Sequence, residues 1–300
     1  MNRNSSIFDY LISVLKGMRV WQWPKNLIVF TIPLGITSTD FLLYQKIFFS
    51  FIGISFLASS VYFFNDIKDI ELDKKHPTKK SRPIPSGEIT IKGAYLVSIA
   101  LAIIGSLLLA FLSTESFILG VAYLGLNILY TYKLKYTKIL DILSISIMFV
   151  MRVLIASSSI QTPASYYLLG FIFFSSAGLA ISKRLSVIND QSIQPSTEYK
   201  GLLEKLYNNN QLGSALNLAS SLSIVTFLFW LRGLTNLNVF SLESIYFVLT
   251  AILMTSILRK ITILSKKGLL EDFIIGVLRE KSLTGQILLS LILLILGLYV

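Results

Sequence analysis

Long uninterrupted blocks of apolar residues dominate the chain, and short polar or strongly charged segments separate them. Each block runs for roughly 18–20 residues, which is the length that a helix needs to cross a hydrocarbon core of about 30 Å. The blocks lack the ten-residue alternation of a membrane β-barrel, so we expect an all-α fold. The pattern predicts a polytopic integral membrane bundle of nine transmembrane helices, at about residues 26–43, 47–64, 93–112, 115–132, 139–159, 164–182, 214–233, 240–258 and 283–300.

The composition agrees with a membrane protein and excludes several kinds of site. Of 300 residues, 54% are hydrophobic and 14% are charged, whereas a soluble domain carries about 25% charged residues. The absence of cysteine excludes disulfides, thiolate metal sites and a cysteine nucleophile. The single histidine, His76, excludes a multi-histidine metal site. With no fixed-period repeat and no low-complexity linker, we expect one domain over residues 1–300.

The charge is strongly basic, with 27 Lys+Arg against 16 Asp+Glu and a net charge of +11. If the N-terminus is cytoplasmic, most basic residues fall on the cytoplasmic side, as the positive-inside rule requires. The basic segments are then an amphipathic interfacial segment at 1–25 and cytoplasmic loops that include 65–92 and 183–213. Topology therefore explains the charge without a nucleic-acid partner. Because the long loops share this side, we expect an active site on the cytoplasmic face.

An acidic cluster follows the second predicted span. Asp66, Asp69 and Asp73 stand at i, i+3 and i+7 and share one face of a helix. Three stacked carboxylates repel one another unless a cation lies between them, and oxygen ligands of this kind suit Mg²⁺. We predict these aspartates as catalytic metal ligands, with Asn65 adding a neutral polar contact. The alternative is a solvated, charged loop.

Basic residues come directly after the acidic cluster. Lys79 and Arg82 belong to a run that also holds Lys74, Lys75 and Lys80, and such side chains bind phosphate oxygens well. The positive-inside rule alone is the alternative explanation for these lysines. Prolines and Gly87 end the loop.

Two further cations are unusually placed. Lys25 stands at the predicted start of the first span, where the helix dipole disfavours a positive charge, so a nearby anion is one explanation and snorkelling is the other. Arg152 lies within the fifth span and should face the bundle interior. Asp141 is about 16 Å away along the same helix, too far for direct pairing. We therefore expect Arg152 to face a phosphate or an acidic partner across the bundle.

The motif Asn65-Asp66-x-x-Asp69-x-x-x-Asp73 resembles the first aspartate-rich motif of the UbiA superfamily of intramembrane prenyltransferases. The run from Asp73 to Gly87 is similar to one branch, the decaprenyl-phosphate phosphoribosyltransferases. Two further stretches resemble segments of that branch. They are Arg19-Val-Trp-Gln-Trp-Pro-Lys25-Asn26, and Asn127-x-x-Tyr130 followed by Lys133-Leu-Lys135. The resemblance covers most of the chain and implies that Lys25, Asn127, Tyr130 and Lys135 bind substrate.

The sixth predicted span departs from the superfamily pattern. Most of these prenyltransferases carry a second aspartate-rich motif there, whereas this chain has Lys183 and Arg184. A Lys-Arg pair suits a phosphoribosyl donor, whose additional 5-phosphate can be held by direct cationic contacts. A positive helix end is the alternative reading of the pair.

The resemblance implies a transferase that moves 5-phosphoribose from phosphoribosyl pyrophosphate to a polyprenyl phosphate, with Mg²⁺ on the departing pyrophosphate. It gives Lys79, Arg82, Lys183 and Arg184 to the donor phosphates, and Lys25, Lys135 and Arg152 to the lipid phosphate. Its setting would be a prokaryotic inner membrane and cell-envelope synthesis. One alternative is prenyl transfer from a diphosphate to an aromatic acceptor, and another is transport of a phosphorylated metabolite. No oligomeric state follows from the sequence.

Overall fold

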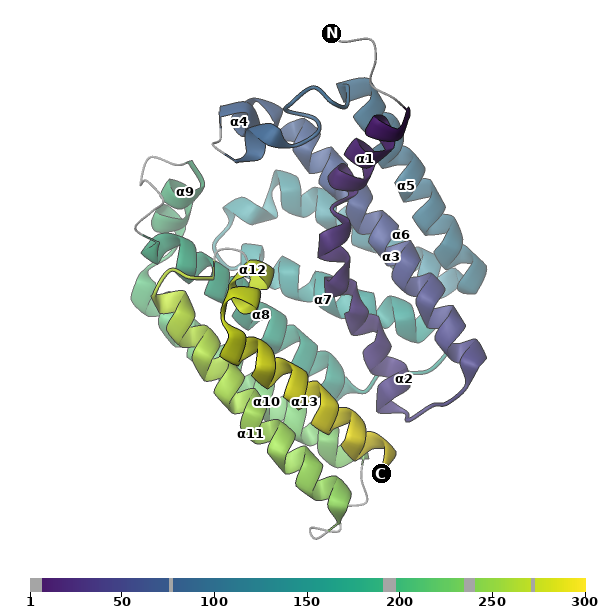
Figure 1. Ribbon diagram of the computed structural model, residues 1–300, viewed down its shortest axis with the longest axis vertical. Helices are drawn as coiled ribbons and strands as arrows, with labels where there is room; N and C mark the ends of the chain where they lie inside the picture. The colour runs from purple at the N-terminus through teal and green to yellow at the C-terminus, as the bar shows by residue number, and fades with distance from the viewer. Residues whose placement is uncertain (1–6, 76–77, 191–197, 235–240, 271–272) are drawn as a thin grey trace. The chain divides into compact units, whose positions relative to one another are not determined.

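The computed structural model describes residues 7–75, 78–190, 198–234, 241–270 and 273–300, and all regular secondary structure in these ranges is helical. The expectation of an all-α fold is therefore confirmed. The helices, labelled in Figure 1, are α1 (Ile7–Met18), η1 (Val20–Phe30), α2 (Thr31–Gly35), α3 (Phe41–Lys68), α4 (Ile70–Lys75), η2 (Lys79–Ser81), α5 (Ile91–Leu112), α6 (Thr114–Tyr132), η3 (Leu134–Tyr136), α7 (Leu140–Ser159), α8 (Tyr166–Asn189), α9 (Glu198–Leu206), α10 (Asn209–Leu234), α11 (Leu242–Lys266), α12 (Phe273–Arg279) and α13 (Lys281–Tyr299).

Seven of the described helices are long and apolar enough to cross a membrane: α3, α5, α7, α8, α10, α11 and α13. Each coincides with one of the predicted spans, so the chain is a multi-pass membrane protein. The count of nine and the orientation stay predictions. The predicted span at 115–132 is helical as α6, but its polar and tyrosine content keeps it outside the seven.

The first predicted span, at 26–43, is not one continuous α-helix. A 3₁₀ helix, η1, ends at Phe30, and the short α2 ends at Gly35. Thr37 adopts φ 48°, a left-handed conformation outside the α-helical region, so an α-helix cannot run through to residue 43. Asp40 then starts α3, because its side chain accepts a hydrogen bond from the backbone N–H of Leu42 at 2.9 Å.

The described chain divides into two compact units, and helix α7 contributes to both. The first unit comprises residues 1–32, 40–131 and 151–163, and the second comprises 33–39, 132–150 and 164–300. A single functional domain over residues 1–300 stays a prediction.

In the first unit, α3 packs along α5 (Figure 1). The two backbones approach closely at Gly53 and Gly105, where a Cβ on Gly105 would lie 2.8 Å from the Gly53 carbonyl oxygen. Small residues permit this kind of close crossing between membrane helices. A second apolar cluster joins α1, α3, α5 and the loop before α5, and its buried members are Met18, Phe63, Ile67, Ile84, Ile89, Ala94 and Leu101.

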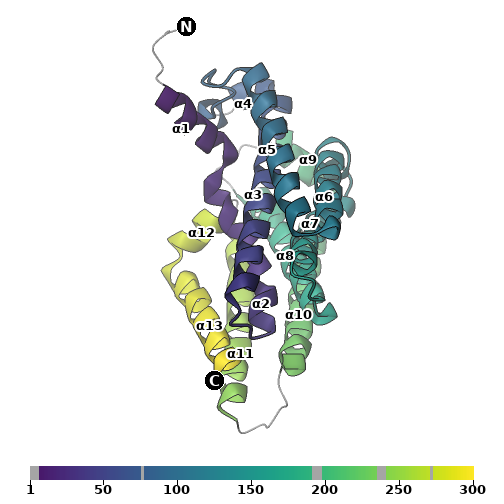
Figure 2. The same cartoon turned by 90° about the vertical axis from the view of Figure 1, so that its right-hand side faces the viewer.

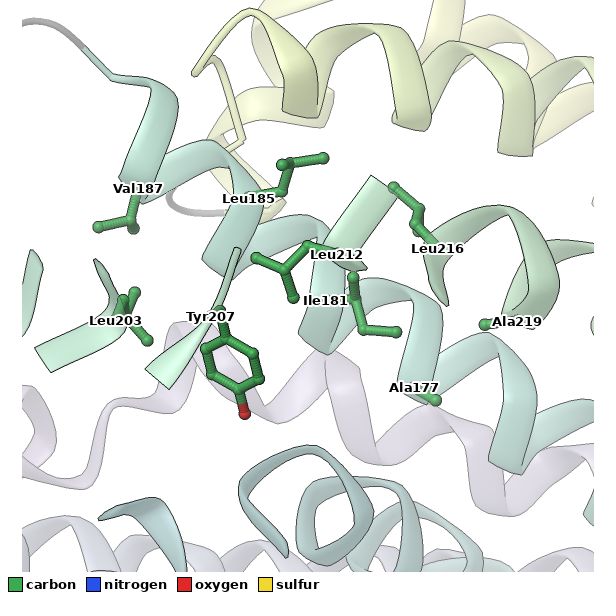
Figure 3. Packing of buried hydrophobic residues seen from close by; sticks show 9 residues of the cluster. All are labelled: Ala177, Ile181, Leu185, Val187, Leu203, Tyr207, Leu212, Leu216 and Ala219. Atoms are coloured by element: carbon green, nitrogen blue, oxygen red, sulfur yellow. The ribbon is translucent and has the colours of Figure 1, made fainter. Parts of the chain in front are cut away.

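In the second unit, α8 packs against α10, and α11 lies beside α13 (Figures 1 and 2). Figure 3 shows the apolar residues of α8 facing those of α10, with Leu203 of α9 and Tyr207 beside them. The Tyr207 hydroxyl points away from the other labelled side chains. The tyrosine thus contributes its ring to this core and its hydroxyl to a polar contact.

Two predicted loops contain more helix than the sequence suggested. The segment 65–92 holds the end of α3, all of α4 and η2. The segment 183–213 holds the end of α8, the short α9 and the start of α10. The predicted interfacial segment at 1–25 contains α1 and the start of η1, with an exposed apolar face that includes Ile7, Phe8 and Leu11.

Candidate functional site

The acidic cluster lies where α3 passes into α4. Asp69 caps α3, yet the helical hydrogen-bond pattern continues through it. The Asp69 N–H donates to the Asn65 carbonyl at 2.9 Å, and the Asp73 N–H donates to the Asp69 carbonyl at 2.8 Å. Successive turns therefore carry Asp66, Asp69 and Asp73, as the sequence spacing predicts. Asp66 and Asp73 are buried, each 3% exposed, and Asp69 is half-buried.

One guanidinium joins the two buried carboxylates. Arg82 Nη1 lies 3.0 Å from Asp66 Oδ1 and 2.6 Å from Asp73 Oδ2. Lys79 Nζ lies 4.0 Å from Asp73 Oδ1. A buried carboxylate needs a close cation because it has lost most of its hydration. The sequence neighbours Lys79 and Arg82 are thus folded back onto the acids that precede them.

The loop that carries Arg82 is held by packing and by its own backbone. Ile84 and Ile89 are buried in the cluster with α1, α3 and α5. The Ile89 N–H donates to the Pro83 carbonyl at 2.9 Å. Gly87 has φ 84°, a left-handed conformation that glycine adopts without strain. Arg82 is therefore presented by an ordered turn.

Arg19 is a site residue that the sequence prediction missed. Its Nη2 donates to Asp66 Oδ1, and its guanidinium stacks over the Tyr62 ring at 4.8 Å. Its backbone is left-handed, with φ 53° and ψ 50°, which is uncommon for a residue with a side chain. Only its place in the Arg19–Asn26 stretch could have drawn attention to it, because Asp66 is 47 residues away.

Asn65 is oriented by α6. Thr131 Oγ1 donates to Asn65 Oδ1 at 2.8 Å, and Lys68 Nζ donates to the Thr131 carbonyl at 2.8 Å. Asn127 Nδ2 donates to the Tyr123 carbonyl of its own helix at 2.7 Å, and Tyr130 is half-buried one turn further along. The structure thus places the predicted residues Asn65, Asn127 and Tyr130 in the same unit, with Thr131 as a further residue of this contact.

Arg152 is buried, 8% exposed, among polar side chains of the first unit. Its Nε donates to Asn26 Oδ1 and its Nη2 donates to the Tyr123 hydroxyl, both at 2.9 Å. Asn26 Nδ2 in turn donates to Ser55 Oγ at 3.0 Å. The expectation that Arg152 faces inward agrees with this geometry. Lys25 is exposed and lies in the middle of η1, so the premise that it starts a helix is wrong, because the helix begins at Val20.

The second unit holds the predicted residues Lys135, Lys183 and Arg184. Arg184 is buried and donates two hydrogen bonds to Asp141, from Nε to Oδ2 at 2.5 Å and from Nη2 to Oδ1 at 2.6 Å. Its Nη1 donates to the carbonyl of Ala180 at 2.6 Å. Lys183 is exposed, and Lys135 Nζ lies 5.0 Å from the centre of the Tyr136 ring.

Tyr207 completes this buried pair. Its hydroxyl donates to Asp141 Oδ2 and lies equally close to the Lys138 carbonyl, 3.2 Å in each case. Burial, followed by the nearby Asp141 carboxylate, raises the pKa of Tyr207 well above its usual value. The ion pair between Asp141 of α7 and Arg184 of α8 holds these two helices together, which is a structural role for Arg184. Its predicted contact with a donor phosphate stays a prediction.

Among the residues that the structure describes, no group of three or more acidic, histidine or cysteine side chains converges as a metal site. His76 lies outside the described residues. The chemistry of Asp66 and Asp73 nevertheless fits Mg²⁺, which is held by one or two carboxylates together with substrate phosphates. A single Arg82 nitrogen already contacts both carboxylates, so they are close enough to share one cation.

Comparison with known proteins agrees with this architecture. The model of the UbiA prenyltransferase family matches residues 27–268. A decaprenyl-phosphate phosphoribosyltransferase of Mycobacterium tuberculosis is 30% identical over 60% of this chain and 62% of its own length. The protein of that name from Mycolicibacterium smegmatis is 28% identical over 72% of this chain and 69% of its own length. The chain thus spans about three fifths to two thirds of these curated relatives.

Solved structures resemble the fold along nearly the whole chain. A UbiA homologue from Archaeoglobus fulgidus, bound to DMAPP and Mg²⁺, has a TM-score of 0.70 at 15% identity and covers 95% of this chain and 97% of its own. A digeranylgeranylglyceryl phosphate synthase structure has a TM-score of 0.67 at 18% identity and covers 96% and 98%. At these identities the likeness concerns the fold alone. Because the family model covers most of the chain and the fold agrees, the chain belongs to the UbiA prenyltransferase family.

Proposed function

We propose that the protein transfers 5-phosphoribose from phosphoribosyl pyrophosphate to a polyprenyl phosphate, releases pyrophosphate and depends on Mg²⁺. The observation that carries the proposal is the cluster of Asp66, Arg82 and Asp73, in which two buried carboxylates and a cation meet at the end of a membrane-spanning helix. Such a cluster suits a metal–diphosphate complex next to a lipid. The names of the mycobacterial relatives support a polyprenyl phosphate as the acceptor and a phosphoribosyl group as the group transferred.

The reaction is a substitution at the anomeric carbon of ribose. A phosphate oxygen of the lipid forms the new bond to this carbon while the bond to the pyrophosphate oxygen breaks, and pyrophosphate takes the bonding electrons. The attacking phosphate is already an anion, so no general base is required. The transferred group keeps its 5-phosphate.

The chain's own residues bind and orient the donor. Asp66 and Asp73, with Asp69 one turn from each, would hold Mg²⁺, and Arg82 and Lys79 would contact the phosphate oxygens. When bound, Mg²⁺ supplies positive charge that offsets the charge developing on the departing pyrophosphate. The Asn65 side chain is oriented by Thr131, and its amide NH₂ can donate a hydrogen bond to the same pyrophosphate. Lys25 and Arg152 remain candidates for the lipid phosphate.

The proposal includes a setting that the same resemblance implies: a prokaryotic cell membrane, with the N-terminus and this cluster on the cytoplasmic side. The donor is water-soluble and the acceptor is a lipid. A site at the end of α3 can receive the first from water and the second from the bilayer.

Labelled phosphoribosyl pyrophosphate and a polyprenyl phosphate, incubated with the purified protein in lipid nanodiscs, test the proposal. We expect a labelled lipid and an equal amount of pyrophosphate. A parallel reaction supplies a prenyl diphosphate and an aromatic acceptor, since the family also contains prenyltransferases. Product in this second reaction alone would refute phosphoribosyl transfer.

The variant Asp73→Asn tests whether the acidic cluster carries the activity. Its matched control is Glu71→Gln on the same short helix, because Glu71 is exposed and pairs with the neighbouring Lys74. We expect the first variant to lose at least 100-fold in transfer rate and the second to keep it. Equal activities in the two variants would remove the cluster from the reaction.

A further inference from the structure

Two arginines contact the same oxygen of Asp66. Arg19 Nη2 and Arg82 Nη1 both donate to Oδ1. A carboxylate that accepts from two guanidinium groups at one oxygen has a restricted orientation. The two arginines come from different surroundings, and this difference suggests different roles.

Arg19 is held in place from several sides. It follows α1, whose last turn packs so closely on α3 that a Cβ on Gly17 would lie 2.5 Å from the Phe63 ring. Ser59 Oγ donates to the Met18 carbonyl at 2.9 Å and accepts from Trp23 Nε1 at 3.1 Å. Contacts to α3 thus fix the chain on both sides of Arg19.

The backbone at Arg19 is strained in this position. Its left-handed conformation is strained for a residue with a Cβ, and such strain persists only where the surrounding contacts require it. The Arg19 guanidinium lies over the Tyr62 ring, and the Arg19 side chain is less exposed than that of Arg82, 20% against 30%. Arg82, by contrast, projects from a loop and contacts two carboxylates at once.

We propose that Arg19 is a positioning residue for the metal–diphosphate site. It would stay on Asp66 Oδ1 and keep this carboxylate oriented for the cation, whereas Arg82 would leave the carboxylates and contact the donor phosphates. The inference rests on the proposed function, because it assigns a role within that site. Partners that orient a ligating carboxylate typically contribute 10–100-fold to metal affinity.

The variant Arg19→Asn tests the assignment, since asparagine tolerates the left-handed backbone but carries no guanidinium. The control is Gln161→Asn, an exposed residue of the same unit with φ 52° that the site does not use. Thermal stabilisation by Mg²⁺ and inorganic pyrophosphate is measured as Mg²⁺ is titrated. We expect the midpoint of the titration to rise 10–100-fold for Arg19→Asn and to stay unchanged for Gln161→Asn.

Steady-state kinetics separate the two arginines. At saturating Mg²⁺, Arg19→Asn should keep the KM for phosphoribosyl pyrophosphate within about threefold, whereas Arg82→Asn should raise it at least tenfold because a phosphate contact is lost. A midpoint that falls for Arg19→Asn would show that Arg19 competes with the cation, and one that does not move would show that Arg19 contributes nothing to metal binding. Either result overturns the inference. If the original protein is not stabilised by Mg²⁺ and pyrophosphate and transfers no phosphoribose, the proposed function fails as well.

Discussion

Replacing Arg184 by methionine removes a buried cation from the contact between α7 and α8. Arg184 and Asp141 are both 2% exposed, and three hydrogen bonds of 2.5–2.6 Å fix the guanidinium on Asp141 and on the Ala180 carbonyl. In the variant, the Asp141 carboxylate stays buried without this partner. The sequence suggests a phosphate-binding role for Arg184, whereas this geometry predicts a structural one.

The expected loss of stability follows from the burial of the pair. Removing one member of a buried ion pair costs about 3–5 kcal/mol, because the remaining charge loses its charged partner and does not regain its hydration. Replacing both members by apolar residues of similar volume is often neutral. We therefore expect Asp141→Leu combined with Arg184→Met to lie within about 1 kcal/mol of the original protein.

Reversible unfolding by SDS in mixed micelles, followed by circular dichroism, measures these differences. Arg259→Met on α11 is the control, because Arg259 is exposed and surface substitutions usually stay within about 0.5 kcal/mol. A single Arg184 variant as stable as the original, or a double variant no better than the single, would refute a structural ion pair. Loss of transfer in a fully stable double variant would support the phosphate-binding role.

Three further predictions concern packing, hydrogen bonding and pH. Gly105→Ala should cost about 1–3 kcal/mol in the SDS assay, because its Cβ would lie 2.8 Å from the backbone of α3, whereas Gly125→Ala has open space and should cost nothing. Asn26→Leu removes the acceptor of the Arg152 Nε–H and should cost about 1.5–3 kcal/mol in the same assay. The pKa of Tyr207 is raised in the folded protein, so its contribution to stability is complete below about pH 10 and is lost as the pH rises further. The free energy of unfolding should therefore fall less steeply with rising pH in Tyr207→Phe than in the original protein. Equal slopes in the two proteins would contradict the burial argument.

Local features of the chain were predictable because they depend on neighbouring residues. Apolar blocks of helical length located the seven helices that can cross a membrane. The spacing of Asp66, Asp69 and Asp73 placed them on successive turns, and the backbone hydrogen bonds continue through all three. The same reasoning failed at residues 26–43, where the chain forms the end of a 3₁₀ helix and a short α-helix, and a left-handed Thr37 follows them.

The partners of the charged residues were not predictable in this way. Arg19 meets Asp66 across 47 residues of sequence, Arg184 meets Asp141 across 43, and Arg152 meets Asn26 across 126. Each of these pairs joins segments that are distant in the sequence, so it depends on how those segments pack together. Hydrophobic periodicity gives a helix an inward face, but it does not say which neighbour that face will contact.

The sequence by itself therefore determined the helical membrane architecture, the family motif and the types of side chain available for phosphate and metal. Only the tertiary structure decided how those side chains are used. It placed Arg82 between two carboxylates, Arg19 behind one of them, and Arg184 in a buried pair with Asp141. The physical reason is that a buried charge must find an opposite charge or a dipole nearby, and packing between distant segments determines which one it finds.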